Sequence, residues 1–95
     1  MNSSTKLLAS KCVSVRMINN DEGFLMNSEN GDVFEINLTT KLIFDLVSTE
    51  MTIDEVYEAL REKAGDSSFD VSKQDIIDII LFFVENDICV EVSHS

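Results

Sequence analysis

The chain has 95 residues, the length of one domain, and carries 18 acidic against 7 basic residues for a formal net charge of −11. Such a charge repels phosphate backbones, so nucleic acid is excluded as an expected partner. Apolar residues make up 44% of the chain and recur periodically, which predicts a compact fold rather than disorder.

The cysteines and the histidine predict no metal site and no cofactor. Cys12 and Cys89 lie far apart without CxxC spacing, and the single histidine, His94, is close to the C-terminus. Both cysteines are in apolar, strand-like contexts and are expected to be reduced, as is typical of an intracellular protein. The longest apolar run, Ile79 to Val84, is too short to span a membrane, and the N-terminus lacks the hydrophobic region of a signal peptide. We therefore expect a cytoplasmic protein with no membrane partner.

The first part of the chain predicts three strands in one antiparallel sheet. Residues 1–11 are mostly polar and are expected to be flexible, and residues 12–18 then alternate between apolar and polar. A second strand is expected over residues 24–27 and a third over residues 32–37, with Phe34 and Ile36 facing one side of the third strand. Between them, the Asn30-Gly31 pair suits a type I′ hairpin turn.

The rest of the chain predicts three helices and a short C-terminal strand. The first helix is expected to begin near residue 39 or 40 and to end by about residue 50. Thr52 and Glu55 form a capping box for the second helix, which runs to about residue 64. Ser72 and Asp75 mark the start of the third helix, which continues to residue 85. Asn86 and Asp87 can then adopt a left-handed turn, the strand covers residues 88–92, and residues 93–95 are expected to be flexible.

The third helix is unusually apolar. At 100° per residue its apolar arc is about 200° wide, whereas a surface helix needs an arc of about 100°. One half of the arc is suited to the core and consists of Ile76, Ile79, Ile80 and Phe83. The other half has no obvious partner in so short a chain and consists of Ile77, Leu81 and Val84. Phe82 lies apart, among acidic residues. The alternative is that this helix is central and buried on several sides.

No catalytic constellation stands out in the sequence. We find no nucleophile with a base, no paired carboxylates that predict a cleft, and no glycine loop that would cradle a phosphate. The acidic residues of the second helix lie on its polar side, which is typical of a solvated face. We therefore expect a protein that is not an enzyme and that acts by recognition.

The third strand is a candidate for that recognition. It lies at one end of the predicted sheet, so one of its edges carries unpaired backbone N–H and C=O groups. An extended peptide can add to such an edge as a further strand, while neighbouring pockets provide selectivity. The alternative is that the edge is covered by the chain's own tail or by a second copy.

The order of these motifs resembles a known family. The run VFEINLTTKLIFDLVSTEMTIDEVYEAL is similar to the strand, Leu/Ile-Asn, helix and T-x-x-E pattern of PqqD-like proteins. Asp75-Ile76 with Ile79, Ile80 and Phe83 resembles the closing helix of the same family, and the likeness covers residues 12–92. This family is the RiPP precursor peptide recognition element, a winged helix-turn-helix that binds the leader segment of a ribosomally made precursor. The resemblance implies a fold of the α+β class, with a three-stranded antiparallel sheet followed by three helices and a short C-terminal strand.

The resemblance also implies a binding site. The leader would add as a strand to the third strand and pack against the third helix; the residues are Asp32, Val33, Phe34, Glu35 and Ile36 on the strand, and Lys73, Ile77, Leu81 and Val84 on the helix. Asp87 stands where the family usually has glycine, in a turn that Asp tolerates. The LL-x-P-E segment of the quinone-pathway protein is missing from residues 24–29, which favours a stand-alone element for lasso peptides or radical-enzyme-modified peptides.

The function expected from the sequence is therefore a non-catalytic adaptor. It would bind a leader segment and present the precursor to a modifying enzyme or a leader peptidase, whose docking surface could be basic. One alternative is a winged-helix DNA-binding regulator, but the last helix carries Asp75, Asp78 and Glu85 with Lys73 as its one basic residue. Another alternative is a structural dimerisation module, so a monomer or a weak homodimer is expected.

Overall fold

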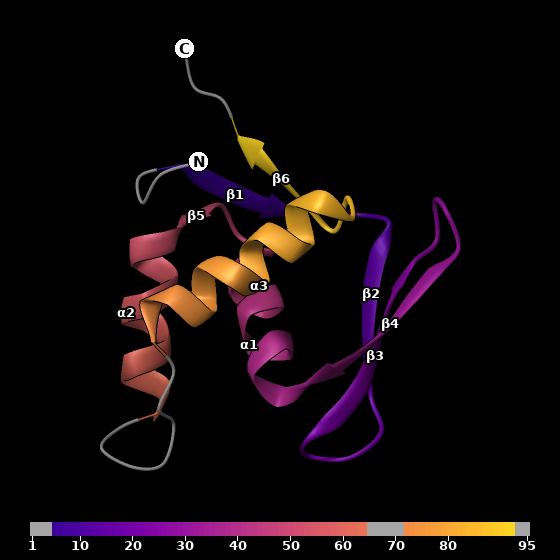
Figure 1. Ribbon diagram of the computed structural model, residues 1–95, viewed down its shortest axis with the longest axis horizontal. Helices are drawn as coiled ribbons and strands as arrows, with labels where there is room; N and C mark the ends of the chain where they lie inside the picture. Colours follow the sequence, from indigo (N-terminus) through magenta and orange to yellow (C-terminus); the bar gives the residue numbers. More distant parts are fainter. Residues whose placement is uncertain (1–4, 65–71, 93–95) are drawn as a thin grey trace.

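The computed structural model describes residues 5–64 and 72–92, and within them it has the α+β class that the sequence predicts (Figure 1). The elements in chain order are β1 (Lys6–Ala9), β2 (Val13–Met17), β3 (Glu22–Asn27), β4 (Asp32–Asn37), α1 (Leu38–Leu46), β5 (Met51–Thr52), α2 (Ile53–Ala64), α3 (Lys73–Glu85) and β6 (Cys89–Val92). The strands form two antiparallel sheets of three strands each, in the orders β2-β3-β4 and β5-β1-β6.

The sheet β2-β3-β4 is the predicted meander. Its register places Val15 opposite Leu25, and Leu25 opposite Phe34, so apolar side chains from all three strands point to the same face. Ile36 and Leu25 are buried on that face, whereas Val33 and Glu35 are exposed on the other, as the alternation predicts. All three helices lie on the inner side of this sheet, and no element among the described residues covers its outer face (Figure 1).

The hairpin between β3 and β4 differs from the predicted type I′ turn. Its register pairs Asn27 with Asp32, so the loop has four residues rather than two. Gly31 alone in this loop has a positive φ, of 80°, and its N–H donates to the Asn27 carbonyl at 2.8 Å. A type I′ turn needs positive φ at both central residues, and Asn30 does not have it.

The second sheet was not predicted. Lys6–Ala9 is its central strand, between β5 and β6, and the side chain of Leu7 is fully buried. The N–H of Ala9 also donates to the Val47 carbonyl at 2.7 Å. The expected flexible N-terminus therefore differs from the structure over this strand, while residues 1–4, residues 93–95 and the loop expected at residues 66–70 lie outside the described residues.

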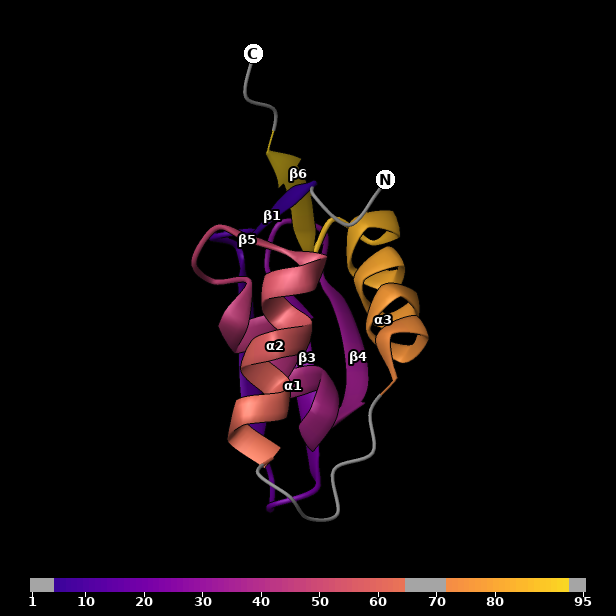
Figure 2. The same cartoon turned by 90° about the vertical axis from the view of Figure 1, so that its left-hand side faces the viewer.

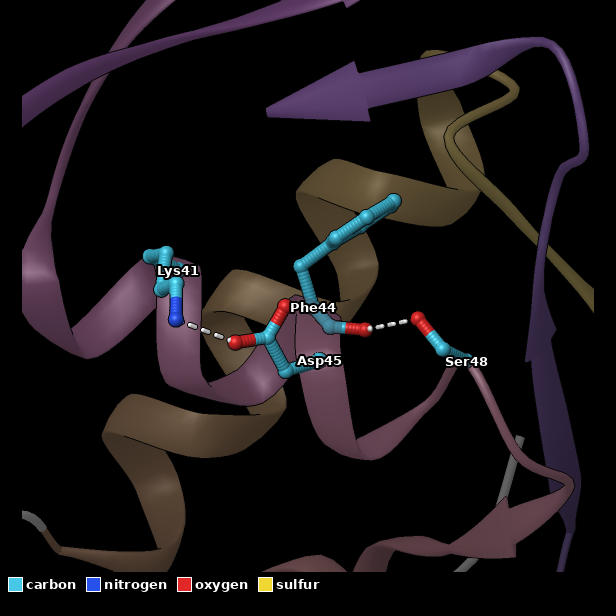
Figure 3. Close-up of polar contacts among 4 residues, drawn as sticks. All are labelled: Lys41, Phe44, Asp45 and Ser48. Carbon is cyan, nitrogen blue, oxygen red and sulfur yellow. Dashed lines mark hydrogen bonds and ion pairs between the residues drawn. The ribbon is translucent and has the colours of Figure 1, made fainter. Parts of the chain in front are cut away.

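Local side-chain signals set the helix starts. Asn37 is the N-cap of α1, and its Oδ1 accepts from the Thr40 N–H at 2.9 Å. The predicted capping box of α2 is confirmed, since Thr52 and Glu55 cap each other. Ser72 and Asp75, which were predicted to mark the start of α3, form a second capping box. Near the end of α1, Lys41 pairs with Asp45 and the Ser48 hydroxyl donates to the Phe44 carbonyl (Figure 3).

The predicted left-handed turn after α3 is also confirmed. Asp87 has a φ of 58°, the Ile88 N–H donates to the Phe83 carbonyl at 2.8 Å, and the Asp87 N–H donates to the Val84 carbonyl. These two bonds form a Schellman motif, which turns the chain into β6 and buries Ile88.

One core joins both sheets and all three helices. The face of α3 that packs into this core carries Ile76, Ile80 and Phe83, none of which is exposed. Phe83 meets Phe44 of α1 edge to face, with ring centroids 6.2 Å apart. The other buried apolar residues are Leu7, Val13, Leu25, Ile36, Ile43, Val47, Ile53, Val56, Leu60, Ile88 and Cys89.

Candidate peptide-binding site

The candidate site begins at the outer edge of β4. Within the described part of the chain, β4 pairs with β3 and with no other strand. Every second residue of such an edge strand directs its N–H and C=O away from the sheet, where they can pair with an added chain. This edge is therefore a template for a further strand.

Helix α3 lies beside this edge. Figure 2 shows β4 with β3 on one side of it and α3 on the other. The two elements meet through aromatic side chains, because the Phe34 and Phe82 rings are edge to face with centroids 5.1 Å apart. Phe82 also contacts Phe83, with centroids 6.0 Å apart. Phe34 and Phe82 are both only partly buried, so they offer apolar surface next to the free edge.

The five predicted residues of β4 are together on this strand. Asp32, Val33 and Glu35 are exposed, Phe34 is half-buried, and Ile36 is buried in the core. Backbone groups of these residues can contact a peptide, and the side chain of Phe34 can do so as well. The side chain of Ile36 belongs to the core.

The four predicted residues of α3 lie on the flank of the helix away from Phe82. Lys73 forms an ion pair with Asp54 of α2, which shows that this flank approaches α2. Ile77 and Val84 are half-buried, and Leu81 is 40% exposed. At 100° per residue these positions and Phe82 fall on opposite sides of the buried row of α3. The structure therefore joins β4 to Phe82, and a peptide-binding role for the other flank stays a prediction.

Phe82 is the residue that the sequence reasoning did not assign to the site. Its signal was present, since it is the one aromatic residue on a side of α3 that also carries Asp75, Asp78 and Glu85. Ile79 is half-buried one turn earlier and lies on the same flank. An aromatic side chain on a charged helix face indicates that this face packs against another part of the protein or against a partner.

The electrostatic environment of the site is acidic. The two flanking elements carry five carboxylates in the described structure, namely Asp32, Glu35, Asp75, Asp78 and Glu85. Their one cation is Lys73, which is paired with Asp54. Asp75 is part of the helix cap, and Asp78 accepts a hydrogen bond from the Gln74 amide at 3.0 Å. A ligand at this edge therefore meets negative charge.

The described residues include no group of three or more His, Cys, Asp or Glu side chains that could hold a metal ion. Burial, with a smaller contribution from the nearby Glu91 carboxylate, raises the pKa of Cys89 to about 12. Its thiol is thus neutral and inert at physiological pH. None of the helices described is long and apolar enough to cross a bilayer.

No model of a known protein family matches the chain, and no curated protein is significantly similar to it. The likeness to PqqD-like proteins therefore rests on the order and spacing of the sequence motifs.

Proposed function

We propose that this protein is a non-catalytic adaptor that binds an extended peptide, the leader of a ribosomally made precursor, by strand addition to β4. The observation that carries the proposal is the free edge of β4 beside the Phe34–Phe82 contact. Backbone hydrogen bonds to the edge supply affinity, and a side chain placed against the two rings supplies selectivity. The three-stranded meander and the three helices then act as the winged helix-turn-helix of the PqqD-like family.

The small number of anchoring side chains favours moderate affinity. An extended leader loses conformational entropy when it becomes ordered, and only a few side chains anchor it. A Kd in the micromolar range, about −8 kcal/mol, agrees with this balance. The adaptor then holds the precursor while a separate enzyme modifies or cleaves it. An acidic protein body can dock on a basic surface of that enzyme, and a fall in their affinity with added salt would test this contact.

The test starts from a short candidate precursor peptide, which is sought among the genes that neighbour the gene of this protein. Its synthetic leader is titrated into 15N-labelled protein, and amide shifts are followed by NMR. We expect the largest shifts in residues 32–37 and on the Phe82 flank of α3. The proposal is wrong if the leader fails to bind, or if the shifts gather on the β2 edge instead.

Self-association is the second candidate function, and the outer face of β2-β3-β4 favours it. This face exposes Phe24, Met26 and Val33 at 37%, 40% and 58%. The register places Phe24 between Arg16 and Glu35 on the same face. A second copy turned about an axis along β3 would set Arg16 of one chain opposite Glu35 of the other, with the Phe24 rings in contact. Sedimentation over a range of concentrations separates the candidates, because the adaptor needs no dimer; a Phe24→Ser variant that stays dimeric would exclude this interface.

A DNA-binding role has less support. The one cation of α3, Lys73, is engaged with Asp54, and the remaining charges of the helix are carboxylates. Phosphate groups would therefore be repelled by this helix.

A further inference from the structure

The side chains on the two sides of the β4 edge indicate which kind of peptide can bind there. On the outer face of β4, Glu35 is exposed and lies between Val33 and Asn37. On the inner side, the half-buried Phe34 meets Phe82. A chain paired with β4 would alternate its side chains between these two environments, because strand side chains have a period of two.

We propose that the peptide recognised at this edge alternates basic and apolar residues, with Lys or Arg on the outer face beside Glu35 and an apolar residue against the Phe34–Phe82 pair. This inference rests on the proposed strand addition and defines the chemistry of its ligand. A basic peptide of this kind differs from an acidic leader, which an unpaired Lys73 would favour.

Three observations support a basic rather than an acidic ligand. Opposite charges on directly facing strand residues stabilise a pair, whereas like charges destabilise it, so Glu35 selects a cation across the new strand boundary. Asp78 of α3 adds negative charge near Phe82 from the other side of the edge. The one cation of α3, Lys73, lies on the opposite flank and pairs with Asp54 of α2, so it does not neutralise the carboxylates near Phe82.

The experiment uses three synthetic peptides of about eight residues, the length of a strand. All have acetyl and amide ends and Val at every second position, and the other positions are Lys, Gln or Glu. Binding to the full chain is measured by isothermal titration calorimetry at about 0.05 M and about 0.5 M NaCl. We expect the Lys peptide to bind at least about tenfold more tightly than the Glu peptide at low salt, and the difference to shrink at high salt.

A charge reversal locates the effect. Glu35→Lys is expected to invert the order, so that the Glu peptide binds more tightly than the Lys peptide. The matched control is Glu58→Lys, the same change at an exposed position of α2, far from β4 in Figure 1. This control is expected to keep the original order, because its charge is remote from the edge and screened.

The outcomes separate this inference from the function on which it rests. If the Gln and Glu peptides bind as tightly as the Lys peptide, the charge preference is overturned while strand addition stands. If Glu58→Lys inverts the order as fully as Glu35→Lys, the preference comes from net charge and the local inference is again overturned. If none of the three peptides binds, both the inference and the proposed peptide-binding function fail.

Discussion

Replacing Phe82 by Ala removes the ring that joins α3 to β4. Full burial of a Phe side chain corresponds to a loss of about 3–5 kcal/mol on truncation to Ala, and Phe82 is half-buried, so we expect a loss of about 2 kcal/mol in the free energy of unfolding. This figure includes the edge-to-face contact with Phe34, for which about 1 kcal/mol is typical. The domain should stay folded, and urea denaturation followed by circular dichroism measures the change.

The same substitution should weaken peptide binding. A bound strand loses the apolar surface of Phe82, and we expect a rise in Kd of about tenfold, or about 1.4 kcal/mol. Fluorescence anisotropy of a labelled peptide measures this change. Leu81→Ala tests the other flank, which the sequence predicted to bind the peptide; if the peptide lies beside Phe82 instead, this variant should leave the Kd within about twofold of the native value. A larger effect from Leu81→Ala than from Phe82→Ala would refute the placement of the peptide beside Phe82.

Three further predictions concern stability. Asp87→Gly should raise the free energy of unfolding by about 0.5 kcal/mol in urea titrations, because an L-residue is strained at the φ of 58° found there; a loss of stability would contradict the Schellman assignment. Leu7→Ala should lower it by about 3 kcal/mol, because Leu7 is fully buried in the central strand of the second sheet, and a loss below about 1 kcal/mol would mean that β1 is dispensable. The raised pKa of Cys89, about 12 against an ordinary 9.0, adds stability that is fully present below pH 9.0 and is lost as pH rises towards 12, since the unfolded chain ionises first. Urea titrations between these pH values should therefore show native stability falling relative to a Cys89→Val variant, and parallel pH profiles of the two proteins would contradict this.

Local patterns in the sequence predicted the parts of the fold that local physics determines. The alternation of Val13 to Met17 and of Val33 to Ile36 assigned the strands and their buried faces correctly. The capping boxes at Thr52 and Ser72 placed two helix starts. These signals act within a few residues, so no knowledge of the rest of the fold was needed.

The second sheet could not be predicted in this way. Strand β1 has four residues and β5 has two, and they are held by pairing with β6 at the far end of the chain. The Leu7-Leu8 pair was the one local signal, and it is too short to distinguish a strand from a loop. Pairing between strands at opposite ends of the chain depends on the arrangement of the helices between them, so local sequence patterns cannot predict it.

The sequence could predict the β4 half of the candidate site but not the α3 half. The position of β4 at the end of a meander follows from strand order, so its free edge could be predicted. The flank of α3 that faces β4 could not, because periodicity gives the angles between residues but not the rotation of the helix relative to the sheet. That rotation depends on how α3 packs on α1 and α2, and it places Phe82 rather than Leu81 beside Phe34.

Hydrogen exchange at β4 tests strand addition most directly. Amide exchange rates of 15N-labelled protein are measured with and without a saturating alternating Val/Lys peptide. Strand addition predicts that alternate amides within residues 32–37 become protected, since only every second N–H points to the added strand. Unchanged exchange along β4 when the peptide is bound, or protection at β2 or β6 instead, would contradict the account.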